Sequence, residues 1–150
     1  MKSMLKKTWV LLVLGAVALS FSVLPGGEGF EISLNDKIIV KRYGSDMEKV
    51  QTLQLNAASS GDKLTIKYYH CGRVGKNKTI IFKDIKGNII KEIHFADVNN
   101  PIAAMTLRVE EILKLKKGNA TLGLYYSSSE LPSGRMLVKI NYGKAGTVMP

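Results

Sequence analysis

Short runs of alternating apolar and polar residues recur along most of the chain, and each run stops at residues that favour turns. In the clearest run, Lys63–Tyr69, one face carries Leu64, Ile66 and Tyr68. Successive side chains of a β-strand point to opposite faces, so this pattern predicts a strand with one buried and one solvent-facing side. A chain built from such runs lacks the crossover helices of a parallel α/β sheet and is expected to form a sandwich or barrel.

The pattern as a whole predicts about eight strands. The strands expected besides Lys63–Tyr69 are Lys37–Tyr43, Val50–Leu55, Lys78–Lys83, Ile89–Phe95, Ala103–Val109, Thr121–Tyr126 and Arg135–Tyr142. In the first of these, Ile38 and Val40 are expected on one face. The segment Glu110–Lys117 has acids first and lysines last, which suits one or two helical turns. We therefore predict an all-β, mainly antiparallel sandwich, immunoglobulin-like or jelly-roll, with at most one short helix.

The best-specified hairpin is the one connected by Asp84–Asn88, which supplies a glycine where φ can be positive. Its inward side chains are expected to be Ile80, Phe82, Ile93 and Phe95. With an aspartate, a glycine and apolar residues on each side, this hairpin resembles the strand–turn–strand unit of bacterial immunoglobulin-like secreted modules. The resemblance covers this hairpin alone, and it implies the same fold class.

The N-terminus has the three parts of a secretory signal peptide. Lys2, Lys6 and Lys7 precede an uncharged apolar run that starts at Thr8, and small residues follow that suit a signal peptidase. We predict a signal peptide over residues 1–22, export to a secreted or periplasmic location, and one domain over residues 23–150 with an ordered core of about 32–143. The alternative is an uncleaved membrane anchor, because the apolar character continues to residue 24.

The chain is basic, with 22 lysines and arginines, 12 acids and a formal net charge of +10. This excess favours anionic partners, although the lysines are spread over most strands, as on an ordinary solvated surface. Export argues against nucleic acid as the partner. Cys71 is the single cysteine, which excludes a disulfide within the chain.

Basic residues gather after the strand that ends in two tyrosines, in a predicted loop over His70–Lys78. A second predicted loop, Ser127–Arg135, follows another pair of tyrosines. If both strands run the same way, the two loops lie at the same end of the sandwich and form a cationic surface. The predicted ligand-binding residues are Tyr69, His70, Arg73, Lys76, Lys78 and Arg135.

Catalytic and metal chemistry are weaker readings of the same stretch. His70 and Cys71 are adjacent, so in a strand they point to opposite faces and could pair only where the chain bends. His94 adds a further ligand type for copper or zinc, but the spacing of these residues fits neither a blue-copper loop nor a four-ligand zinc site. We expect no catalytic residue, no metal and no cofactor.

The leading interpretation is an exported, non-catalytic binding or adhesion module that recognises an anionic polysaccharide, a glycan or a cell-envelope component through the cationic loop end. The first alternative is a structural or assembly subunit that pairs with a protein partner through a sheet edge. The second is a thiol-dependent enzyme that uses Cys71. Membrane contact is expected only through an uncleaved N-terminal segment.

Overall fold

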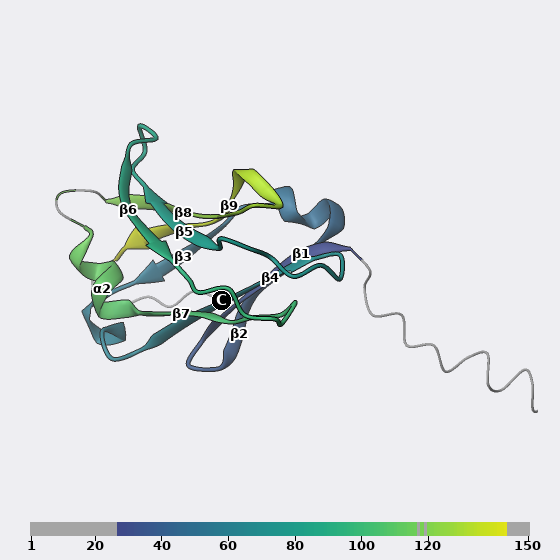
Figure 1. The fold of residues 1–150 in the computed structure, drawn as a ribbon. Helices are drawn as coiled ribbons and strands as arrows, with labels where there is room; N and C mark the ends of the chain where they lie inside the picture. The colour runs from purple at the N-terminus through teal and green to yellow at the C-terminus, as the bar shows by residue number, and fades with distance from the viewer. Residues whose placement is uncertain (1–26, 117, 119, 144–150) are drawn as a thin grey trace, which may run out of the picture.

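The computed structural model describes residues 27–116, 118 and 120–143, and within them the chain forms two facing β-sheets (Figure 1). The first sheet has the strand order β2-β1-β4-β7, and the second has the order β3-β9-β8-β5-β6. The predicted all-β sandwich is therefore confirmed. The predicted signal peptide over residues 1–22 lies outside the described residues.

Every strand of the first sheet pairs antiparallel with its neighbours. In the second sheet the pairing is antiparallel except between β3 and β9, which run parallel. The strands are β1 (Glu28–Leu34), β2 (Lys37–Tyr43), β3 (Gln51–Leu55), β4 (Lys63–His70), β5 (Thr79–Lys83), β6 (Ile89–His94), β7 (Met105–Arg108), β8 (Thr121–Ser128) and β9 (Leu131–Tyr142).

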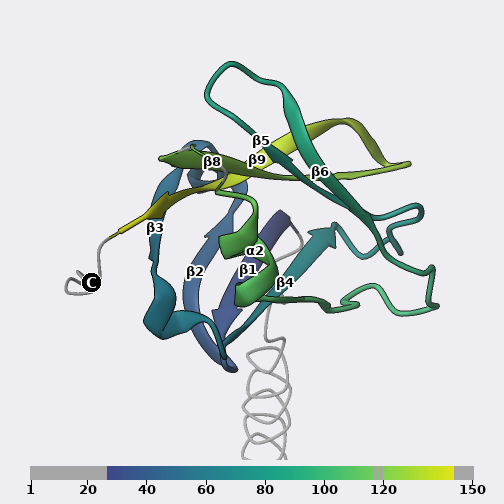
Figure 2. The same cartoon turned by 90° about the vertical axis from the view of Figure 1, so that its left-hand side faces the viewer.

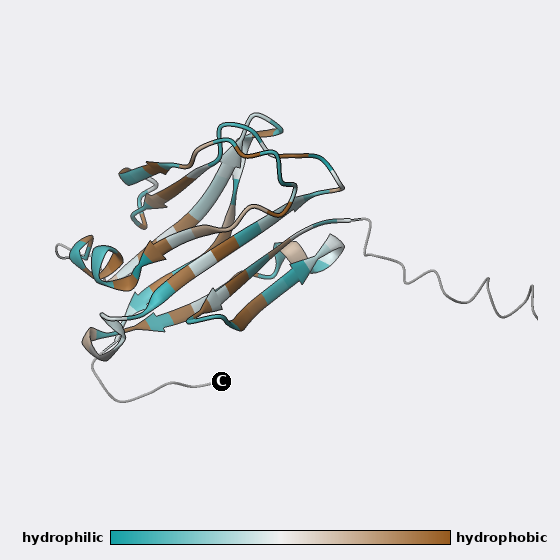
Figure 3. Cartoon of the chain, turned by 60° about the horizontal axis from the view of Figure 1, so that its bottom comes forward, coloured by the Kyte–Doolittle hydropathy of each residue, from teal (hydrophilic) through white to brown (hydrophobic). Residues whose placement is uncertain are grey.

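The core lies between the two sheets and is filled by the apolar face of each strand, as the alternating colours in Figure 3 show. On β4 the predicted inward residues Leu64, Ile66 and Tyr68 are all buried. Ile80 and Phe82 of β5 are also fully buried, as the sequence pattern predicts. Burial of apolar surface at about 25 cal/mol per Å² is the main favourable contribution to such a fold.

The strand β1 begins earlier than the predicted ordered core and lies at the centre of its sheet, between β2 and β4. Gly29 makes the stretch look like a linker in the sequence. In the structure Gly29 pairs with Tyr43 on one side and Tyr69 on the other. A Cβ atom at Gly29 would lie 2.2 Å from the ring of Tyr43, so the glycine makes room for an aromatic side chain to lie across the strand.

One predicted inward residue of β2 faces solvent instead. The pairing of β1 with β2 shifts so that Ile32 pairs with Val40 and Ser33 pairs with Ile38. The extra residue between them, Ile39, forms a β-bulge, and a bulge reverses the phase of the side chains that follow it. Val40 is buried as predicted, whereas Ile38 is 50% exposed.

The predicted helix is confirmed as α2 (Val109–Lys114), which follows β7 directly. Glu110 pairs with Lys114 one turn later, and the acids at the start and lysine at the end agree with the helix dipole. Ile112 is buried, and Figure 2 shows α2 between the layers of the two sheets. The helix thus closes one end of the sandwich.

The predicted loop over Ser127–Arg135 is wrong. β8 continues to Ser128 and β9 begins at Leu131, so the connection is a short turn at Ser129 and Glu130. Gly134, at φ +68°, lies where the ladder is irregular.

Candidate functional site

The connection between β4 and β5 is held against the β8–β9 turn. The Ser129 amide donates to the Lys76 carbonyl at 2.8 Å, and the Lys76 amide donates to Glu130 Oε2 at 2.9 Å. The side-chain amide of Asn77 also donates to Ser129 Oγ at 2.8 Å. The two segments predicted to meet at one end of the sandwich therefore do meet, held by one backbone–backbone hydrogen bond and two that involve side chains.

Only part of the predicted cationic set faces solvent there. Arg73 and Lys76 are exposed, and neither forms an ion pair with any described residue. Lys78 is buried, and its amine donates to the Gly75 carbonyl at 3.2 Å. Arg135 lies within β9, where its guanidinium is 3.5 Å from a carboxylate oxygen of Glu28.

Acidic residues share this end of the sandwich with the cations. Glu130 accepts the Lys76 amide, and Asp97 Oδ1 accepts the Asn77 amide at 2.8 Å. Glu28 lies beside Arg135 and accepts the Tyr68 hydroxyl at 2.6 Å. The surface consequently carries both signs of charge, and the unpaired cations on it are Arg73 and Lys76 among the residues described.

Tyr69 belongs to a different surface, the outer face of the first sheet. Its hydroxyl donates to Glu31 Oε2 at 3.0 Å, and the Tyr43 hydroxyl donates to Glu31 Oε1 at 3.0 Å. Lys41 completes the group with an ion pair of 2.8 Å. Burial raises the pKa of Glu31, but the hydrogen bonds from Lys41 and the tyrosines outweigh it and hold this pKa below its usual value.

His70 points into the sandwich and connects the two sheets. Its Nε2 lies 2.8 Å from the Tyr126 hydroxyl and 3.3 Å from Ser128 Oγ, both on β8 of the opposite sheet. The ring of Tyr68 stacks on that of Tyr126 with centroids 4.2 Å apart. Burial is the main reason that the pKa of His70 lies below its ordinary value. His70, Tyr126 and Ser128 thus form a hydrogen-bonded polar cluster that joins the two sheets within the core.

The partners of His70 were missed in the sequence, although their positions carried a signal. Ser128 and Tyr126 have the same parity as the buried Leu122 and Leu124 of β8, so all four point inward. The serine and histidine resemble a nucleophile with its base, but both side chains are buried. The arrangement therefore offers no access for a substrate.

Cys71 is exposed and adopts a positive φ of 51°, immediately after the buried His70. The chain bends here, yet the histidine ring remains with Tyr126 and does not pair with the thiol. Within the described part of the chain, no three His, Cys, Asp or Glu side chains are grouped so that they could hold a metal ion.

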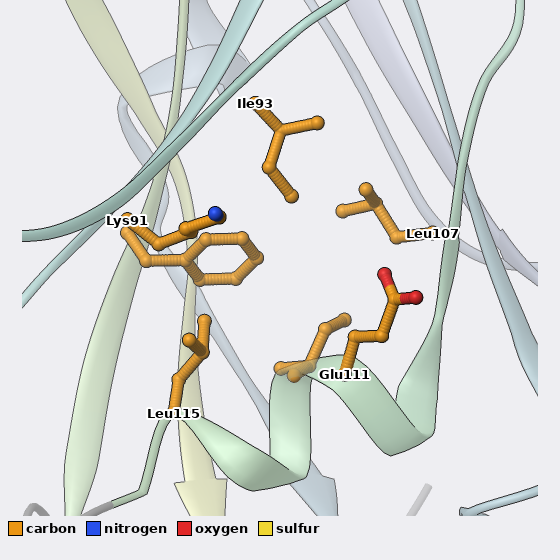
Figure 4. A pocket seen from close by; sticks show the side chains of 7 residues that line it. Lys91, Ile93, Leu107, Glu111 and Leu115 are labelled. Carbon is orange, nitrogen blue, oxygen red and sulfur yellow. The ribbon is translucent and has the colours of Figure 1, made fainter.

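A separate pocket of about 320 Å³ lies between the two sheets at the side where β6 and β7 run. The pocket is lined by Phe82, Lys91, Ile93, Leu107, Glu111, Ile112 and Leu115. Its walls come from β5 and β6 of one sheet, β7 of the other, and α2 with the residue that follows it. Figure 4 shows the amine of Lys91 on one side of the pocket and the carboxylate of Glu111 on the other.

The two charged residues of the pocket differ in whether they have a hydrogen-bond or ion-pair partner. Glu111 accepts two hydrogen bonds from the guanidinium of Arg108, at 2.6 and 3.0 Å. Lys91 has no hydrogen bond or ion pair to any residue that the structure describes. It pairs across the ladder with Phe82, and its parity is that of the inward-facing Ile93. The sequence pattern that predicted Ile93 inward thus also places Lys91 inward.

Two free strand edges flank the pocket, because β6 and β7 are the terminal strands of their respective sheets. Exposed apolar residues are concentrated in the segment that contains β6 and leads to β7. Of the large exposed hydrophobic side chains, those between residues 85 and 102 are Ile85, Ile89, Val98 and Ile102. On the opposite side, the helical turn η1 (Gly44–Glu48) links β2 to β3 and buries Met47.

Comparison with known proteins finds no family model that matches the chain and no curated protein that matches it significantly. In the part of the chain that the structure describes, no helix has the length and apolar character needed to cross a membrane.

Proposed function

We propose that the protein is a non-catalytic binding module that pairs with a protein partner along the free edge of β6. The observation that carries this proposal is the apolar pocket between β6 and β7, the terminal strands of the two sheets. A strand added at such an edge gains backbone hydrogen bonds, and a pocket beside the edge selects its side chains. The pocket and the edge together supply both elements of recognition.

The distribution of exposed apolar surface supports the same side of the molecule. Ile89 on β6 is 55% exposed and Ile102, in the connection to β7, is 44% exposed. Exposed apolar surface with polar residues around it is typical of protein interaction sites. On the other side of the sandwich η1 connects the terminal strands β2 and β3, whereas β6 borders the pocket and is therefore the better candidate for strand addition.

A matched pair of lysine substitutions tests this function. Ile93→Lys places a charge in the pocket, whereas Ile38→Lys places the same charge on β2, the edge strand at the far side of the first sheet. We expect short peptides selected from a displayed library to bind the protein and the Ile38→Lys variant equally, and to lose affinity for Ile93→Lys. Thermal unfolding of both variants verifies that they are folded. Equal binding to all three proteins would exclude the pocket side.

A second candidate function is supported by the exposure of Arg73 and Lys76, whose cations have no ion-pair partner among the described residues. In this alternative the module recognises an anionic polysaccharide, a glycan or a cell-envelope component. Heparin binding that decreases with salt and disappears in a double glutamate variant of these residues would support it. Glutamate at the exposed Lys37 serves as the control, and equal loss in that variant would indicate attraction by net charge alone.

We also propose that the domain acts outside the cytoplasm, in a secreted or periplasmic location. The basis is the lysine-rich start and apolar run of residues 1–22 in the sequence. Mass spectrometry of the exported protein tests this, since cleavage should remove about that many residues. A chain that remains full-length in the membrane fraction would favour the anchor instead.

A further inference from the structure

Lys91 is the one lining residue of the pocket that combines a charge with an apolar setting and lacks a partner among the described residues. It faces inward from the edge strand β6, opposite Phe82 and on the same side as Ile93. Because Lys91 is exposed although it lines the pocket, water solvates its amine while the pocket is open. A partner that fills the pocket would remove that water, and an unpaired charge is costly to desolvate.

The other charge of the pocket does not compensate Lys91. Glu111 is held by Arg108 in an ion pair of 2.6 Å, on the opposite side of the cavity (Figure 4). The chain as a whole has a formal net charge of +10, which favours a partner with anionic groups. A carboxylate from the partner is the group that would neutralise it on closure.

We propose that the segment bound at β6 carries one large apolar residue and one acidic residue separated by a single position. The apolar side chain enters the pocket opposite Ile93, and the carboxylate pairs with Lys91. This inference rests on the proposed pairing of a protein partner with β6, and it adds the chemistry by which that partner is selected.

The spacing follows from strand geometry. Lys91 and Ile93 are two residues apart and share the inner face of β6. In a strand added beside β6, the residues opposite them are also two apart, because every second side chain of a strand lies on the same face. Opposite charges that face each other across paired strands attract, which makes the acidic position specific. An acid placed next to the apolar residue would point away from Lys91.

The experiment uses synthetic peptides that share one extended, threonine-rich sequence. In the first peptide a leucine and a glutamate are separated by one residue, and both orders are made because the strand direction is open. In the second a glutamine replaces the glutamate, in the third a lysine replaces it, and in the fourth the leucine and glutamate are adjacent. Calorimetry with the full-length protein and with Lys91→Glu measures affinity, and hydrogen exchange of β6 amides reports the site.

We expect the spaced glutamate peptide to bind about fivefold more tightly than the glutamine and adjacent peptides, the upper range for an opposite-charge pair across strands. The Lys91→Glu variant should instead prefer the lysine peptide. Protection of β6 without any charge preference would overturn this inference and leave the proposed pairing intact. If no peptide protects β6, both fail. If Lys91→Glu self-associates but keeps the original peptide preference, Lys91 only guards the edge and the inference is wrong.

Discussion

Removal of the Tyr126 hydroxyl group tests whether its hydrogen bond to His70, which connects the two sheets, stabilises the fold. In Tyr126→Phe the ring remains and can still stack on Tyr68, whose centroid is 4.2 Å away. The 2.8 Å hydrogen bond to His70 Nε2 is lost, and Ser128 Oγ at 3.3 Å remains as a hydrogen-bond partner of that nitrogen. Burial raises the pKa of Tyr126 to about 12, so the group is a neutral hydroxyl at any pH used in the assay.

The expected loss of stability follows from these contacts. A net hydrogen bond contributes about 1 kcal/mol, and a buried group left unsatisfied costs about 1–3 kcal/mol. Because Ser128 still offers a partial replacement, we expect the free energy of unfolding to fall by about 1–2 kcal/mol. With an m-value of about 2 kcal/mol/M, this lowers the urea midpoint by about 0.5–1 M with an unchanged slope.

The neighbouring tyrosine provides the control. Tyr125 is half-buried on the opposite face of β8, with the amine of Lys83 4.7 Å from the centre of its ring, and its hydroxyl has no hydrogen bond to any residue described. Tyr125→Phe should therefore leave the urea midpoint nearly unchanged. If the two variants shift the midpoint by the same small amount, the contact between His70 and Tyr126 does not stabilise the sandwich, and the reasoning is refuted.

Two further predictions concern the same sheets. Burial lowers the pKa of His70 below its ordinary 6.5, so the histidine of the unfolded chain is protonated at a higher pH than that of the folded chain. The free energy of unfolding should therefore fall as the pH drops from 7 toward 5, and in His70→Gln the urea midpoint should depend less on pH over this range. If the variant shows the same pH dependence, that dependence arises from other groups. Gly29→Ala should lower the free energy of unfolding by about 1–3 kcal/mol, because its Cβ would lie 2.2 Å from the Tyr43 ring and 2.8 Å from the Arg42 carbonyl oxygen. Gly27→Ala, with no atom within 4 Å of the new Cβ, is the control in thermal unfolding, and similar melting temperatures for both would contradict the crowding argument.

The fold class could be predicted because the sequence alternates with the period of a half-buried strand. In β4 this alternation is uninterrupted from Leu64 to Tyr68, and the structure buries its predicted face. The same reasoning failed where local composition resembles a turn. Gly29 lies inside a central strand, where it pairs with tyrosines of the two neighbouring strands. These pairings join residues that are far apart in the sequence. Such pairings are absent from any local pattern.

The charge of the His70–Lys78 loop was harder to predict, because it depends on contacts with residues far away in the sequence. Lys78 contributes a positive charge to the count, yet its amine is turned inward onto the Gly75 carbonyl. Arg135 is far from Glu28 in the sequence but lies beside it in space. A count of local cations therefore overestimates the free charge of this end, and the acids brought there by other strands are what the count omits.

Lys91 illustrates the opposite case, in which the sequence held the information and the residue type concealed it. Parity with Ile93 already places Lys91 on the inner face, whereas a charged residue in an edge strand is ordinarily assigned to solvent. An inward lysine on a free edge reduces self-pairing by making burial of that edge unfavourable for an uncharged or basic strand. The same unfavourable term vanishes for a strand that carries a carboxylate opposite Lys91. Protection against self-association and selection of an acidic partner are thus two consequences of the same cost of desolvating Lys91. A substitution at Lys91 that increases self-association should therefore also reduce the preference for an acidic partner.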